Sequence, residues 1–176
     1  FVTFSGVIAG AGGLNKTGSG SLLLTGNNSY TGATNVTGGF LFVDGDQIAA
    51  TGPINVSGTG TRLSGNGIIG GDANLSGGAS FGPAAEPNTP ATLTINGNMN
   101  LGSDTVLLYN VIDTTVGGAL NDLTNVRGNL VLDGRIDVVD EGQTLGPGVY
   151  RIINYDGTLT NNGLDIGSLD RKSTRL

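Results

Sequence analysis

Short apolar runs, cut by glycine and by small polar residues, limit how this chain can fold more than any other feature. The clearest example is residues 14–45, which read LNKTGSGSLLLTGNNSYTGATNVTGGFLFVDG. Similar runs recur along the chain, and many alternate apolar with polar residues, as residues 92–96 do (TLTIN). This period of two is typical of a strand with one buried face. Helix propensity is low outside residues 46–50, so the sequence predicts an all-β fold.

Turn signals separate these runs. We expect their glycines to adopt positive φ angles. The signals are Asp44-Gly45, Asn66-Gly67, Asn96-Gly97, Asp133-Gly134, Asp156-Gly157 and Asn162-Gly163. A loose repeat of about 20 to 25 residues, with insertions, is typical of solenoid coils. The pattern favours a right-handed parallel β-helix of about seven coils, a rod of roughly 35 Å. An antiparallel sandwich is the alternative, because the same dipeptides are also hairpin signals.

Composition narrows the function classes. Only 12% of the residues are charged and the net charge is −6, which argues against partners such as nucleic acid or an anionic membrane surface. The sequence contains no cysteine, so a disulfide framework and thiol chemistry are excluded. It contains no histidine, which excludes a Ser-His-Asp triad and a histidine metal site.

Two stretches interrupt the pattern and suggest internal boundaries. Residues 82–90 are rich in proline and predict an extended loop, and residues 111–121 predict a second loop. We therefore expect β-helix coils at residues 1–121 and a more charged and aromatic β cap at residues 122–168, closing the C-terminal end of the rod. The basic residues 169–176 are interpreted as a domain junction or an artificial remnant.

Residues 14–45 resemble the passenger-associated transport repeat of bacterial autotransporters, the proteins of type V secretion. The residues that carry the resemblance are Leu14, Lys16, Thr17, Gly18, Ser19, Gly20, Leu22, Leu24, Thr25 and Gly26, followed by Asn28, Tyr30, Thr31, Gly32, Val36, Gly39 and Leu41. Later segments are similar to the coils that follow this repeat in such passengers. They are residues 65–71, 92–98, 126–134 and 148–157.

The resemblance implies that the chain is the C-terminal part of a surface-exposed passenger. Such passengers cross the outer membrane unfolded and are anchored by a downstream outer-membrane β-barrel, which with the rest of the passenger would be the partner in cis. The location would be extracellular or the bacterial cell surface, either anchored or released. The cap at residues 122–168 would be autochaperone-like, folding first, because a preformed coil lowers the cost of adding the next one.

Candidate sites for chemistry are few. One acidic cluster could carry glycoside chemistry, although a solvated strand and turn is the favoured explanation. Its residues are Asp133, Asp137, Asp140 and Glu141. Asp44 and Asp46 flank a turn and raise the alternative of a calcium site. The turn at Ser103-Asp104 lacks the context of a nucleophile. The interpretation is that the chain has no catalytic, cofactor or metal site.

Two sets of residues could form surface features or structural ones. Sequons at Asn27, Asn35, Asn55 and Asn74 are interpreted as by-products of the repeat. Aromatic residues are interpreted as core, with exposed adhesive contacts as the alternative. They are Tyr30, Phe40, Phe42 and Phe81.

Three functions remain open at this point. The first is a non-enzymatic stalk and folding nucleus that promotes secretion and folding of the passenger. The second is an adhesin or self-association surface that uses asparagine and threonine ladders, with a host surface or another copy as partner. The third is a polysaccharide-active β-helix enzyme.

Overall fold

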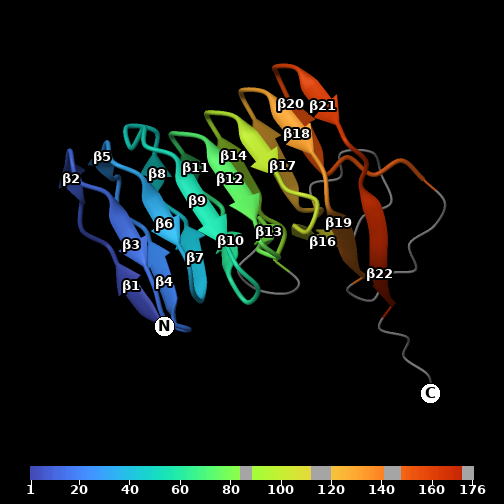
Figure 1. The fold of residues 1–176 in the computed structure, drawn as a ribbon, viewed down its shortest axis with the longest axis horizontal. Helices are drawn as coiled ribbons and strands as arrows, with labels where there is room; N and C mark the ends of the chain where they lie inside the picture. The colour runs from blue at the N-terminus through green and yellow to red at the C-terminus, as the bar shows by residue number, and fades with distance from the viewer. Residues whose placement is uncertain (84–88, 112–119, 141–147, 172–176) are drawn as a thin grey trace.

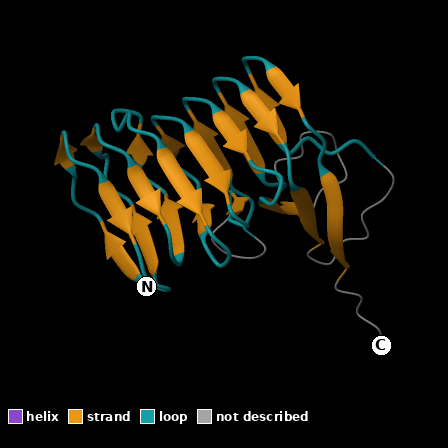
Figure 2. Ribbon diagram, viewed as in Figure 1, coloured by secondary structure: helices purple, strands orange, loops and turns teal. Residues whose placement is uncertain are grey.

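In a computed structural model, the chain is described at residues 1–83, 89–111, 120–140 and 148–171. All regular structure in these ranges is strand (Figure 2). Every pair of neighbouring strands runs parallel. This pairing confirms the parallel β-helix and shows that the antiparallel alternative was wrong. None of the described residues forms a helix long and apolar enough to cross a membrane.

The strands form three faces. The first face is an eight-stranded sheet of β1 (Val2–Phe4), β4 (Ser21–Leu24), β7 (Phe40–Val43), β10 (Arg62–Ser64), β13 (Ser80–Gly82), β16 (Val106–Val111), β19 (Arg135–Asp140) and β22 (Asp165–Arg171). The second face contains β2 (Ala9–Gly10) paired with β5 (Ser29–Tyr30), and a sheet of β8 (Asp46–Gln47), β11 (Ile68–Ile69), β14 (Thr92–Ile95), β17 (Leu123–Val126) and β20 (Ile153–Tyr155). The third face contains β3 (Leu14–Lys16), β6 (Thr34–Val36), β9 (Ile54–Ser57), β12 (Ala73–Ser76), β15 (Met99–Leu101), β18 (Leu130–Leu132) and β21 (Leu159–Asn161).

Neighbours within each sheet are three strands apart in the chain, so the chain visits each face once per turn (Figure 1). Seven three-strand coils result, and β22 continues the first face beyond them. The register gives the coil lengths. Leu63 pairs with Phe81, a coil of 18 residues, whereas Ile136 pairs with Ile166, a coil of 30 residues. Most of residues 82–90 and 111–121, where the sequence predicts two loops, lies outside the described ranges.

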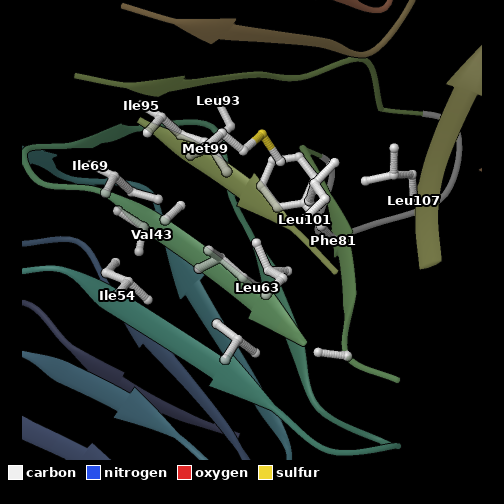
Figure 3. Packing of buried hydrophobic residues seen from close by; sticks show 14 of the residues in the cluster. Val43, Ile54, Leu63, Ile69, Phe81, Leu93, Ile95, Met99, Leu101 and Leu107 are labelled. Carbon is white, nitrogen blue, oxygen red and sulfur yellow. The ribbon is translucent and has the colours of Figure 1, made fainter. Parts of the chain in front are cut away.

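The core is built from columns of apolar side chains, one from each coil. On the first face the register aligns buried Leu41, Leu63, Phe81 and Leu107. Figure 3 shows Leu63, Phe81 and Leu107 within the apolar interior, close to residues of the other two faces. Because each fully buried side chain of this kind contributes about 1.5–3 kcal/mol, stacking one coil on another is the main source of stability.

Residues 120–140 and 148–171 extend the same three faces. β17 pairs with β14, β18 with β15 and β19 with β16, each in parallel. The division at residue 121 between β-helix coils and a C-terminal cap stays a prediction, as does the interpretation of residues 169–176. Of that last segment, residues 172–176 lie outside the described ranges.

Candidate functional site

The residues that carry the transport-repeat resemblance lie in the first three coils, between β3 and β7. Lys16 occupies an inward position of β3, aligned with Val36 of the next coil, and only 8% of it is exposed. Its Nζ donates hydrogen bonds to the carbonyl oxygens of Thr17 (3.1 Å), Gly18 (2.9 Å) and Gly38 (2.7 Å). The buried ammonium thus joins the turns of two successive coils.

A second motif residue joins coils through its side-chain oxygen. Asn28 is buried, and its Oδ1 accepts a hydrogen bond from the backbone N–H of Ile8 in the preceding coil at 2.8 Å. The backbone N–H of Ser29 donates in turn to the Ile8 carbonyl at 2.8 Å. An asparagine at this position therefore continues the hydrogen bonding between coils where the chain turns into the second face.

The tyrosine of the motif, Tyr30, forms a hydrogen bond between two faces of the same coil. The hydroxyl of Tyr30 on β5 lies 2.5 Å from Oγ1 of Thr34 on β6, and both residues are buried. The same arrangement recurs as Tyr109 on β16 and Thr124 on β17, at 2.7 Å. Burial raises the pKa of both tyrosine hydroxyls, so they stay neutral and bind as hydrogen-bonding groups.

Glycines form a column at the corner before the third face, one from each of the seven coils. A Cβ added to Gly32 would lie 2.5 Å from the carbonyl carbon of Gly12, and one added to Gly52 would lie 2.1 Å from the carbonyl oxygen of Gly32. These separations are shorter than real Cβ contacts, so a side chain here would push the coils apart. The column consists of Gly12, Gly32, Gly52, Gly71, Gly97, Gly128 and Gly157.

The prediction of a positive φ angle is wrong for the glycines of four of the six Asn-Gly and Asp-Gly pairs. Of the six glycines, Gly134 and Gly163 have positive φ, at 92° and 106°. The other four lie where one backbone passes closely over another. Glycine is needed at those corners because no side chain fits between stacked coils, and not because of left-handed backbone.

An asparagine ladder runs along the outer side of the third face. Asn15, Asn35, Asn55, Asn74 and Asn100 occupy matching positions in five successive coils. Each Nδ2 donates to Oδ1 of the asparagine in the preceding coil, at 3.0, 3.0, 2.9 and 2.8 Å in order along the ladder. Three of the four sequon asparagines therefore have a structural role in this ladder.

The acidic candidates make contacts typical of turns and strands. Asp137 accepts a hydrogen bond from the N–H of Ser168 (2.8 Å) and forms an ion pair with Arg135 (3.2 Å). Asp133 accepts a hydrogen bond from the backbone N–H of Gly134, the next residue in the same turn, at 2.8 Å. The side chain of Asp140 and all of Glu141 lie outside the described part of the chain.

The proposed calcium residues also bind backbone. Asp44 accepts a hydrogen bond from the backbone N–H of Asn66 at 3.1 Å. Asp46 accepts one from the backbone N–H of Ile48 at 3.0 Å. Within the described ranges, no group of three or more acidic side chains is placed to hold a metal ion.

Most of the aromatic candidates are core residues. Tyr30, Phe42 and Phe81 are at most 5% exposed, whereas Phe40 is 39% exposed. Phe40 packs edge-on against Phe42, with 6.3 Å between the ring centroids. Phe40 is therefore the member of this set that could form an external contact.

Sequence reasoning did not single out Asp122, the buried carboxylate among the described residues. Its carboxylate is fully buried and accepts hydrogen bonds from the N–H of Ala91 (3.0 Å), the N–H of Asn110 (2.8 Å) and Nδ2 of Asn110 (3.0 Å). Burial raises the pKa of Asp122, and these hydrogen bonds and the charge of Arg62 partly oppose the rise. Burial also lowers the pKa of Arg62. Asp122 thus links Ala91, which follows residues 82–90, to Asn110, which precedes residues 111–121. No local sequence motif indicates this role.

Comparisons with known proteins agree with this architecture. The family model described as passenger-associated-transport-repeat matches residues 14–41, and no solved structure matches the chain. The Adhesin BmaC autotransporter of Brucella suis is 51% identical over 162 residues, covering 91% of this chain and 5% of the relative.

Two further relatives match smaller or more distant parts. The Extracellular serine protease of Serratia marcescens is 49% identical over 70 residues, covering 40% of this chain and 6% of the relative. The Uncharacterized protein YuaQ of Escherichia coli is 29% identical over 161 residues, covering 88% of this chain and 11% of the relative. The chain therefore spans a small part of the curated relatives it matches, and their names agree with a location at the cell surface or outside the cell. Together with the stacked coils of residues 14–41, these matches support an autotransporter passenger repeat region in this chain.

Proposed function

We propose that this chain is a stalk segment from the C-terminal part of its passenger that promotes the secretion and folding of that passenger. The observation that carries the proposal is the repetition of one coil geometry, in which the asparagine ladder and the glycine column each align one residue per coil. The likeness of residues 14–41 to the transport repeat supports the same function.

The physical reason lies in the edge that each coil presents. A coil in place offers unpaired backbone groups, an open column of apolar side chains and an aligned asparagine amide to the segment that follows or precedes it. Adding a coil to this edge forms many hydrogen bonds at once, whereas the first coil must order its backbone with few compensating contacts. A stable stack therefore lowers the cost of folding for chain that has just left the membrane.

Two deletions in the full-length protein test this proposal. Removing residues 34–53 deletes one whole coil, because Thr34 and Ile54 are register partners. Removing residues 34–43 deletes only half a coil and shifts every downstream column. We expect near-normal surface display and protease resistance for the whole-coil deletion, and reduced secretion or protease-sensitive passenger for the half-coil deletion. Equal behaviour of the two variants would contradict the proposal.

The partners we propose are in cis: the rest of the passenger and the outer-membrane β-barrel of the same protein. The isolated chain should fold on its own if it nucleates the stack. Far-UV circular dichroism and resistance to protease would report this, and a disordered isolated chain would contradict a folding-nucleus function.

An adhesive or self-associating surface is a second candidate function. The specific observation that favours it is the outer side of the asparagine ladder, where Asn15 is exposed and the other four asparagines are half-buried, and the Brucella relative is named an adhesin. Cell aggregation should decrease when the chain is deleted from the passenger while secretion stays intact. Unchanged aggregation and unchanged adhesion would remove this candidate.

We infer that the chain has no catalytic activity of its own. Asp133 and Asp137 bind backbone N–H groups in the structure, which favours a structural role. The overlap with the Serratia protease covers 6% of that relative. Replacing Asp133 and Asp137 by Asn should leave any polysaccharide-cleaving activity of the full protein unchanged, and a loss of activity would contradict this inference.

A further inference from the structure

A polar concavity lies where β17 and β20 end. Figure 1 shows that these two strands belong to the coils nearest the C-terminal end of the stack. Its volume is about 470 Å³, within the range of about 300–1,000 Å³ usual for sites of small molecules. The lining residues used in the argument below are Asn125, Arg127, Arg151, Asn154 and Asp156.

The charged groups of this concavity have an excess positive charge. Arg127 is paired with Asp156, with 3.1 Å between Nη1 and Oδ2, and both side chains are more than half exposed. Arg151 is exposed and forms no hydrogen bond or ion pair with any residue that the structure describes. Its guanidinium is therefore available, and a guanidinium binds a carboxylate through two parallel hydrogen bonds. In a chain with a net charge of −6, this local positive charge is unusual.

The other lining groups fit the rest of a sugar ring. Asn154 donates Nδ2 to Oδ1 of Asn125 at 2.9 Å, which fixes both amides in one orientation. Each amide keeps further donor or acceptor capacity for hydroxyl groups.

We propose that this concavity binds a carboxylate-bearing sugar of the uronic acid class. Arg151 binds the carboxylate, and the amides of Asn125 and Asn154 bind hydroxyl groups. The proposal does not depend on the stalk function, since a stalk needs no ligand.

The test is a titration of the 176-residue chain with glucuronate, glucose and acetate, followed by calorimetry or NMR. We expect glucuronate to bind more tightly than either of the others. The matched variants are Arg151→Gln and Arg135→Gln, because Arg135 is also an exposed arginine but lies on the first face, in an ion pair with Asp137. Arg151→Gln should weaken glucuronate binding by about tenfold or more, which is the contribution of one charge-assisted hydrogen-bonded pair. Arg135→Gln should leave the affinity unchanged.

Three outcomes would overturn the proposal. They are no glucuronate binding by the unmodified chain, equal effects of the two arginine variants, and acetate binding as tight as that of glucuronate. Asn154→Ala supplies a second variant, and we expect it to weaken glucuronate binding without changing that of acetate. Equal urea midpoints for Arg151→Gln and the unmodified chain would show that the variant is folded.

Discussion

The glycine column makes a sharp prediction about Gly52. A Cβ at this position would lie 2.1 Å from the carbonyl oxygen of Gly32 and 2.8 Å from that of Thr31. Ordinary contact begins at 3.4 Å, so the corners of two coils would have to separate by more than about 1 Å out of a strand spacing of ~4.8 Å. The neighbouring hydrogen bond from the N–H of Thr34 to the carbonyl of Pro53, now 2.9 Å, would then be stretched beyond useful length.

The expected loss of stability follows from these terms. Overpacking of this kind costs about 1–3 kcal/mol. Losing one backbone hydrogen bond adds about 1 kcal/mol. Alanine has less conformational freedom than glycine in the unfolded chain, and this offsets about 0.4–1 kcal/mol of the lost stability. Gly52→Ala should therefore lower the free energy of unfolding by about 2–3 kcal/mol.

Urea unfolding followed by far-UV circular dichroism measures this change. With a slope of about 2 kcal/mol per M, the midpoint should fall by about 1–1.5 M. Gly12→Ala is the matched control, since Gly12 is in the same column, has no atom within 4 Å of the added Cβ and lacks a positive φ. Its midpoint should be unchanged or slightly higher. Equal midpoints for the two variants would refute the close-approach explanation of the column.

Further predictions concern other buried polar groups. Lys16→Met should destabilise the chain by about 1–3 kcal/mol in urea unfolding, because three carbonyls lose their donor; an unchanged midpoint would contradict this. Asn55→Ala breaks two ladder bonds and Asn15→Ala one, so the first should cost about twice as much. Because burial raises the folded pKa of Asp122, its contribution to stability is fully present below about pH 4 and is lost as pH rises through the folded pKa. The stability of the unmodified chain relative to Asp122→Asn should therefore fall with rising pH; a constant difference would contradict it.

Much of the fold could be predicted from local pattern. The alternation of residues 92–96 indicates a strand with one buried face, and that segment contains β14. The transport-repeat residues of 14–45 predicted stacked coils, and the structure confirms them. The loops expected at residues 82–90 and 111–121 stay predictions, because residues 84–88 and 112–119 lie outside the described ranges. The division between coils and cap at residue 121 had no such support.

The roles of single residues were harder to predict. Gly45 and Gly67 look like residues of positive-φ turns, yet the structure places Gly67 with its missing side chain 2.3 Å from the Gly45 carbonyl oxygen. Lys16 looks like a surface charge, yet its ammonium is buried among carbonyls. Each role depends on which residue of another coil lies beside it, and that information is absent from local sequence.

The sequence by itself determined the unit of this protein: a short strand, a corner that needs glycine, and a next strand with one apolar side. These are properties of neighbouring residues, and backbone sterics and hydrophobic burial act on them directly. Only the tertiary structure decided the register, because coils of 18 to 31 residues cannot be aligned by a fixed period. The register joins Asn15 to Asn35, ties Ala91 to Asp122 and brings the ends of β17 and β20 together around one concavity.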